Sequence, residues 1–211
     1  MINNSKKVAL IAGAANKVGT SVASKLKDSG WSVIGIDAVS EADSLYDGFY
    51  SIDMTDRDKF VDVVEEIADT YGPIKVLFCA TGFEKDRQSG GFLETPIKQW
   101  ERTLDGWLKS SINACFAVGK KMVKNKDGRI MILSPDYSKA EGDNILMAVG
   151  AGTLHGFAKS LGVELAKDNV LVNCVYANIP FNYNAIASTA HFLSESANYV
   201  TGQVISIRGI D

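Results

Sequence analysis

The chain has 211 residues, of which 46% are hydrophobic and 22% are charged, a composition typical of a globular protein with a sizeable core. Its formal net charge of -3 at pH 7 argues against a protein that binds nucleic acid or an anionic membrane surface. No apolar run is long enough for a membrane span or for the core of a signal peptide, so the sequence predicts a cytoplasmic protein.

Short β-branched apolar runs alternate with longer amphipathic segments along the chain, and they predict strands and helices respectively. In chain order, the expected strands cover residues 8–12, 31–37, 74–79, 129–133, 170–175 and 204–207, with one more strand just before Asp53. The expected helices cover residues 18–29, 56–71, 100–124, 144–166 and 185–194.

This alternation indicates an α/β fold. Apolar strands separated by helices are typical of a Rossmann-like, doubly wound parallel sheet, here of about seven strands with helices on both faces. No repeat, low-complexity tract or linker divides the chain, so residues 1–211 are expected to form a single domain. Cys79, Cys115 and Cys174 lie far apart in apolar segments, which favours buried free thiols over disulfides or a metal site.

A glycine-containing turn follows the first expected strand and reads Gly13-Ala14-Ala15-Asn16-Lys17-Val18-Gly19. Such a turn bends backbone amides around a pyrophosphate at a helix N-terminus. Asp37 ends the second strand, where a carboxylate accepts hydrogen bonds from ribose hydroxyls and repels a ribose phosphate, favouring NAD over NADP. A purely structural turn, with Asp37 capping its strand, would give the same pattern.

The turn resembles the Thr-Gly-x-x-x-Gly-x-Gly pattern of the short-chain dehydrogenase/reductases, with Ala12 for the Thr and Lys17 for the middle Gly. Thr201-Gly202-Gln203 resembles another family stretch, and the resemblance extends over essentially the whole chain. In the family, an Asp at the place of Asp53 contacts adenine. The resemblance implies a vestigial NAD site, which would be formed by Gly13, Asn16, Lys17, Gly19, Asp37 and Asp53.

The same resemblance implies that the catalytic residues have been lost. Family members use a Tyr as proton donor and, one helical turn later, a Lys that lowers the pKa of this Tyr. The stretch from Gly156 to Ala166 resembles the family segment after that Lys, and counting back places Met147 at the Tyr and Ala151 at the Lys. Pro135 stands where the family has its catalytic Ser. A thioether and a methyl group donate no proton.

Other family features are also altered. Asn113 matches the relay Asn of the family, and without its partners we expect it to bond to the helix backbone at a bulge. The helical lid over the substrate is shortened to a few residues near 180–185. Asp136, Glu141 and Asp143 are expected to lie in a solvated acidic loop and to have no catalytic role. His155 and His191 are expected to be structural histidines without a catalytic role.

The two long helices at 100–124 and 144–166 are the elements that family members pack between subunits, and the C-terminal strand commonly forms a second contact. Small residues in the second helix would permit close helix approach, although packing on the chain's own sheet would also explain them: Gly150, Ala151, Gly152, Gly156, Ala158 and Gly162.

Three functions are therefore expected as alternatives. The first is a non-catalytic subunit of an NAD-dependent dehydrogenase, paired with an active homologue or with itself, with a hydroxyacyl-CoA as the candidate substrate. The second is an NAD-binding sensor or regulator. The third is a divergent but active oxidoreductase using NAD or NADP, with Tyr137 or Tyr183 as the acid.

Overall fold

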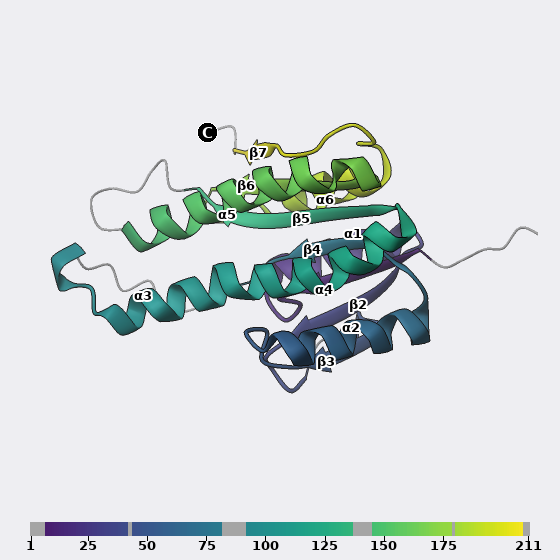
Figure 1. Ribbon diagram of the computed structural model, residues 1–211, viewed down its shortest axis with the longest axis horizontal. Coiled ribbons are helices and arrows are strands. Elements are labelled where there is room, and N and C mark those ends of the chain that lie inside the picture. The colour runs from purple at the N-terminus through teal and green to yellow at the C-terminus, as the bar shows by residue number, and fades with distance from the viewer. Residues whose placement is uncertain (1–6, 42–43, 82–91, 137–144, 179, 209–211) are drawn as a thin grey trace, which may run out of the picture.

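Seven parallel strands form one sheet in the computed structural model, which describes residues 7–41, 44–81, 92–136, 145–178 and 180–208 (Figure 1). The strands are β1 Val8–Ala12, β2 Ser32–Asp37, β3 Gly48–Ser51, β4 Ile74–Cys79, β5 Gly128–Pro135, β6 Val170–Ala177 and β7 Val204–Ile207. Their order is β3-β2-β1-β4-β5-β6-β7, which confirms the doubly wound fold. The order reverses between β1 and β4, and ligands of such folds bind at the carboxyl edge beside this point.

Helices cover both faces of the sheet. One apolar cluster packs α1 (Lys17–Asp28) and α6 (Tyr183–Glu195) on one face, and a second packs α2 (Arg57–Tyr71), α4 (Ser110–Asn125) and α5 (Ile145–Leu165) on the other. Shorter elements complete the description: the 3-10 turns η1 (Phe92–Glu94) and η3 (Ala166–Asp168), the helix α3 (Ile97–Leu104) and the π turn η2 (Asp105–Lys109). Among the described residues, no helix is long and apolar enough to cross a membrane.

The helix expected at 100–124 is not a single regular helix. It begins earlier, at Ile97, and the π turn interrupts it between α3 and α4. Hydroxyl groups accompany this irregularity, because Ser110 donates to the carbonyl of Asp105 at 3.1 Å and Thr81 donates to that of Trp107 at 3.4 Å. Side-chain donors of this kind compete with the regular helical hydrogen bonds, which explains why the periodic pattern alone did not reveal the π turn.

Strand β5 is also longer than expected. It continues to Pro135 because β6 accompanies it in register, with Ser134 opposite Tyr176 and Pro135 opposite Ala177. Ser134 and Pro135, which lie beyond the expected end of the strand at residue 133, are therefore still part of the sheet. The three cysteines are buried free thiols, as expected.

Candidate functional site

The glycine turn lies at the carboxyl edge of β1, where its glycines allow close backbone contacts. Gly13 has a φ of +85°, and a Cβ there would lie 2.3 Å from the carbonyl oxygen of Ala80. A Cβ at Gly19 would lie 2.4 Å from the carbonyl oxygen of Gly13. Both glycines are therefore required by the packing of the chain itself, whether or not a ligand binds.

Asn16 holds this turn together. Its amide group donates to the carbonyls of Gly13 and Ala80, both at 2.8 Å, and its side-chain oxygen accepts from the backbone amides of Val18 and Gly19. Asn16 thus caps α1 with its own side chain. Lys17 begins the helix with an exposed side chain.

Asp37 lies beside the same turn. One carboxylate oxygen accepts from the backbone amide of Ala15 at 2.9 Å, and the other accepts from that of Ala38 at 2.7 Å. A carboxylate has about four acceptor positions, so Asp37 retains acceptor capacity for ribose hydroxyls. The structure therefore brings together Gly13, Asn16, Gly19 and Asp37, and the residues present fit the adenosine side of a dinucleotide.

Asp53 lies beyond the end of β3 and is turned toward its own loop. Its carboxylate accepts from the backbone amide and the hydroxyl of Thr55, both at 2.8 Å. These hydrogen bonds from Thr55, with the charges of Lys109 and Lys59, outweigh desolvation and hold the pKa of Asp53 below its ordinary value. The group is consequently a charged acceptor near neutral pH.

At the opposite side of the switch point, α5 carries the positions expected to have lost catalysis. Ala151 is fully buried and Met147 is half-buried. The indole of Trp107 is pressed against this helix, since a Cβ at Gly150 would lie 2.2 Å from the indole carbon Cε3. A packed aromatic ring thus lies beside Gly150, next to Ala151, the position that was expected to correspond to the family Lys.

Two neighbouring residues have structural contacts. Ser134 is buried and donates to the carbonyl of Pro135 at 3.4 Å. Asn113 is also buried, and its amide donates to the carbonyl of Met54 at 3.1 Å. The expectation that Asn113 bonds to the backbone of its own helix is therefore wrong: it links α4 to the segment after β3.

A buried polar cluster that the sequence reasoning missed lies at the carboxyl ends of β5 and β6. The side chain of Asp136 is 2% exposed, accepts a hydrogen bond from the Tyr176 hydroxyl and lies 3.8 Å from Nε of Arg208. The ring of His155 packs edge-on against that of Tyr176, with centroids 5.1 Å apart. Burial lowers the pKa of His155, although the charge of Asp136 opposes this shift.

This cluster corrects one prediction. Asp136 does not belong to a solvated loop, whereas Glu141, Asp143 and the candidate acid Tyr137 lie outside the described residues. The sequence did contain a signal for the cluster, because the alternation of β6 places Tyr176 on the same face as the buried Val172 and Cys174. The other candidate acid, Tyr183, is the first residue of α6 and 37% exposed.

The connection after β6 is short. Only residues 178–182 separate the end of β6 from Tyr183, where α6 begins under the side-chain cap of Asn182. The region near 180–185 therefore leads directly into a helix that packs on the body of the protein.

Comparison with known proteins agrees with this geometry. The family model described as Enoyl-(Acyl carrier protein) reductase matches residues 13–182. The 3-oxoacyl-[acyl-carrier-protein] reductase FabG of Buchnera aphidicola is 28% identical over 239 aligned positions, which cover 97% of this chain and 96% of the relative. The acetoacetyl-CoA reductase of an Acinetobacter species is 25% identical over 243 positions, which cover 97% of each protein. The solved structure of ElxO with NADP bound superposes with a TM-score of 0.86 at 21% identity and covers 96% of this chain and 97% of ElxO. The chain therefore belongs to the short-chain dehydrogenase/reductase family of oxidoreductases.

Proposed function

We propose that this chain is a non-catalytic subunit that pairs with an active homologue of the same fold through α5. The observation that carries the proposal is that α5 is apolar on both sides. Across Ile145–Leu165 the only residues of the Asp, Glu, Lys and Arg types are Lys159 and Glu164. A helix that is hydrophobic all round is normally buried, whereas the described part of the chain covers only one side of α5.

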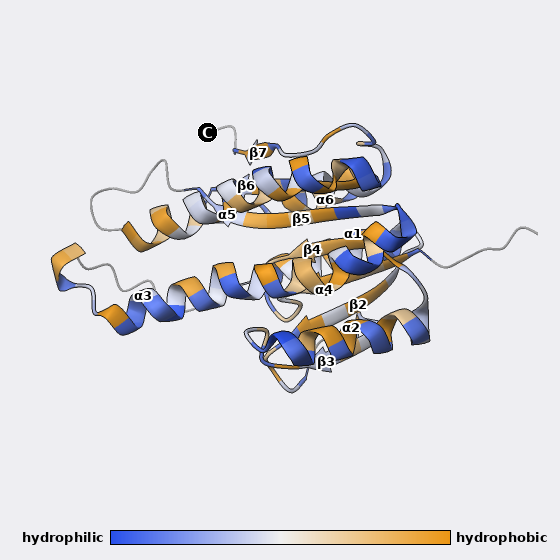
Figure 2. Cartoon of the chain, in the orientation of Figure 1, coloured by the Kyte–Doolittle hydropathy of each residue, from blue (hydrophilic) through white to orange (hydrophobic). Residues whose placement is uncertain are grey.

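The inner side of α5 packs on the sheet and on Trp107, with Gly150, Ala151, Leu154, Ala158 and Gly162 buried. The outer face of α5, which we define as Val149, Gly152, Gly156 and Val163, is exposed. Val163 is 74% exposed, and these residues follow the helical spacing of one stripe, in which the exposed Lys159 and Ser160 also lie. Figure 2 shows that α5 is hydrophobic at its start and carries pale and hydrophilic residues further along. In a soluble complex, a second subunit would cover this stripe.

The glycines on the inner side of α5 differ from those on its outer face in the space around them. Gly150 and Gly162 are explained within the chain, because a Cβ would lie 2.2 Å from Trp107 and 2.7 Å from the backbone nitrogen of Gly202, respectively. A Cβ at Gly152 or Gly156 would meet no atom within 4 Å. Glycine costs a helix about 1 kcal/mol relative to alanine, so two outward glycines call for another benefit. Close approach by a partner helix supplies one.

A catalytic role for the isolated chain lacks a proton donor at the family positions. Met147 and Ala151 offer neither an acid nor a cation, and Pro135 has no hydroxyl. Loss of one general acid costs roughly a hundredfold to ten-thousandfold in rate. The active homologue would supply the Tyr and the Lys, and this chain would stabilise the assembly.

The relatives favour an acyl thioester as the substrate class of the assembly. Their names describe a 3-oxoacyl-[acyl-carrier-protein] reductase and an acetoacetyl-CoA reductase, both of which act on 3-oxoacyl thioesters. The assembly would then be an NAD-dependent oxidoreductase that interconverts a 3-oxoacyl and a 3-hydroxyacyl thioester.

The test is to isolate the tagged chain from its source cells and identify what co-purifies. We expect a family member that carries Tyr-x-x-x-Lys, and co-expression of the two chains should then yield a stable, active complex. Gly156→Leu should abolish the complex while leaving the isolated chain folded. Ser24→Leu, at an exposed position of α1 on the other face of the sheet, is the matched control. A chain that emerges without any such homologue contradicts the proposal.

A second candidate function, NAD binding for regulation, is favoured by the acceptor capacity of Asp37. Together with Asp53 and the cation of Lys17, it would hold the adenosine and phosphate parts of NAD. The cofactor, when bound to an active subunit, supplies hydride chemistry. Calorimetry should show NADH binding, much weaker NADPH binding because Asp37 repels the ribose phosphate, and weakened NADH binding in Asp37→Ala. Absence of heat with NADH at millimolar concentration contradicts this candidate.

A further inference from the structure

The crevice at the carboxyl edge of the sheet has two halves that differ in this chain. A dinucleotide binds across such a crevice where the strand order reverses, because each half of the fold is suited to one mononucleotide. Here the order reverses between β1 and β4. We call the half formed by β1, β2 and β3, which contains the glycine turn and Asp37, the adenosine half. The half formed by β4, β5 and β6 is the second half.

The adenosine half presents polar groups that a ligand can reach. Ala15, Lys17 and Ala38 are exposed, and Asp37 is half-buried. The carboxylate of Asp37 is held by the backbone amides of Ala15 and Ala38 and keeps acceptor positions for ribose hydroxyls. Lys17 adds a cation at the end of the same turn, where it suits a phosphate group. This half therefore offers both an oriented acceptor and a positive charge.

In the second half, the corresponding strand ends are buried. Thr81 after β4, Ser134 in β5 and Ala177 at the end of β6 are each no more than 2% exposed. The two hydroxyl groups are bonded within the chain, because that of Thr81 lies 3.1 Å from the hydroxyl of Ser111 and that of Ser134 donates to the carbonyl of Pro135. A nucleoside would have to break these contacts, and breaking a buried hydrogen bond is costly.

A large side chain packs beside these strand ends. Trp107 is buried and its carbonyl accepts from the hydroxyl of Thr81 at 3.4 Å, while its indole lies so close to α5 that a Cβ at Gly150 would be 2.2 Å from the carbon Cε3. Ala151, expected at the place of the family Lys, is fully buried and carries no charge. These positions of the second half therefore offer neither a charge nor open space to a second nucleoside.

We infer that this chain recognises the adenosine diphosphate portion of a nucleotide and excludes the second nucleoside from its own crevice. The ligand is ADP, either free or as part of a larger nucleotide such as NAD, whose nicotinamide then gains no contact with the second half. The inference rests on the second candidate function and deepens it, because it names the part of NAD that this chain holds. It does not depend on pairing through α5.

The test is calorimetry of the purified full chain with ADP, NAD+ and nicotinamide mononucleotide. The dissociation constants of ADP and NAD+ should agree within about threefold, because both ligands make the same contacts. Nicotinamide mononucleotide should give no heat at millimolar concentration. Binding of NAD+ more than about tenfold tighter than ADP would mean that the second half contributes contacts, and it would overturn the inference while leaving the second candidate intact. Binding of nicotinamide mononucleotide would overturn it in the same way.

Two variants sharpen the measurement. Asp37→Ala should weaken ADP and NAD+ by the same factor, about tenfold, since both ligands use only the adenosine half. Asp62→Asn, which removes a charge at an exposed position of α2, is the control and should change neither affinity. Unequal weakening by Asp37→Ala, or absence of ADP binding to the wild-type chain, overturns the inference. Co-purification of the homologue is measured separately, so the proposed pairing stands or fails independently of these results.

Discussion

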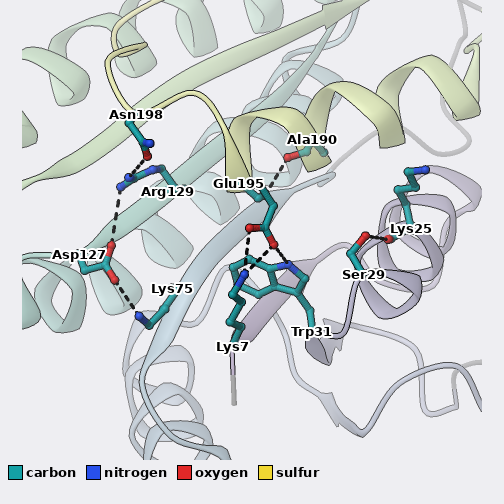
Figure 3. Close-up of polar contacts among 11 residues, drawn as sticks. Lys7, Lys25, Ser29, Trp31, Lys75, Asp127, Arg129, Ala190, Glu195 and Asn198 are labelled. Atoms are coloured by element: carbon teal, nitrogen blue, oxygen red, sulfur yellow. Dashed lines mark hydrogen bonds and ion pairs between the residues drawn. The ribbon is translucent and has the colours of Figure 1, made fainter. Parts of the chain in front are cut away.

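The amino edge of the sheet and the glycine turn at its carboxyl edge are held together by different kinds of contact. At the amino edge, side chains pair with one another: Glu195 accepts from Lys7 at 2.9 and 3.0 Å and from the indole of Trp31 at 2.7 Å (Figure 3). At the carboxyl edge, the glycine turn instead packs backbone directly on backbone, with Gly13 against Ala80.

The two places therefore differ in how well they tolerate an amino-acid substitution. Lys7 is 51% exposed and Glu195 is 27% exposed, so water and salt screen their attraction, and such pairs contribute little individually. The contact of Gly13 involves no screening and leaves no space. The sequence of the glycine turn is therefore constrained by folding alone, and its presence is weak evidence of a bound cofactor.

The largest effect is expected for Gly13→Ala at the carboxyl edge. The substitution forces an L side chain to a φ of +85° and places its Cβ 2.3 Å from a backbone oxygen. The free energy of unfolding should fall by about 3 kcal/mol, as measured by urea denaturation. Gly30→Ala, with a φ of +83° and no atom within 4 Å, isolates the backbone strain and should cost about 1 kcal/mol. Equal losses in the two variants would refute the role of the Ala80 contact.

Gly150→Ala should have the next largest effect. The new methyl group would press on the buried indole of Trp107, at a cost of about 1–3 kcal/mol that exceeds the helix preference for alanine. Gly152→Ala makes the same change two residues away, in open space, and should stabilise the isolated chain by up to about 1 kcal/mol. Thermal unfolding of both variants checks the opposite signs. Destabilisation by Gly152→Ala would show that the outer face of α5 is already covered.

A smaller loss, about 1 kcal/mol, is expected for Glu195→Gln at the amino edge. Glutamine retains an acceptor for Trp31 but loses the charge that pairs with Lys7. Urea denaturation at low and high salt should show the loss shrinking as salt increases. Asp62→Asn, at an exposed position of α2, is the control and should be neutral. A loss independent of salt would mean that packing, and not charge, fixes this edge.

The smallest expected effect is a change in pH dependence. Burial opposes the charged form of Glu195, but its hydrogen bonds with Lys7 and Trp31 outweigh burial and hold the pKa of Glu195 below its ordinary value. A lowered carboxyl pKa stabilises the fold above the unfolded pKa, and this contribution is lost as the pH falls through the folded pKa. Stability should therefore decline below about pH 4.5, and it should decline less steeply in Glu195→Gln. Urea titrations between neutral and acidic pH measure both slopes, and identical slopes would contradict the assignment.

Much of the fold was predictable because the central strands are mainly apolar and buried. Val8–Ala12 and Ile74–Cys79 have the expected boundaries, since each mainly apolar run ends where the chain leaves the sheet. Val204–Ile207 also has the expected boundaries, although its residues are exposed or half-buried at the edge of the sheet. A bulge in this helix was expected at Asn113, but periodicity did not place the π turn at Asp105–Lys109, because Ser110 and Thr81 hold it through side-chain hydrogen bonds. Local periodicity carries no information about such contacts.

The candidate site was predictable only in its local parts. The cap formed by Asn16 depends on neighbours within three residues in the chain, apart from its bond to Ala80. Asp136, by contrast, is buried through Tyr176, 40 residues further along, and through Arg208. The two types of glycine on α5 look alike in the sequence, and only the positions of Trp107, for Gly150, and of Gly202, for Gly162, distinguish inward from outward.

The strand order also determines how the sheet grows while the chain is being synthesised. Every strand after β1 pairs with a strand that precedes it in the chain: β2 and β4 with β1, β3 with β2, and then β5, β6 and β7 each with the one before. A nascent chain can therefore extend its sheet outward from β1 without opening a pair already made. At each stage the newest strand finds its neighbour in place, which limits the time that apolar strand edges are exposed to other chains near the ribosome.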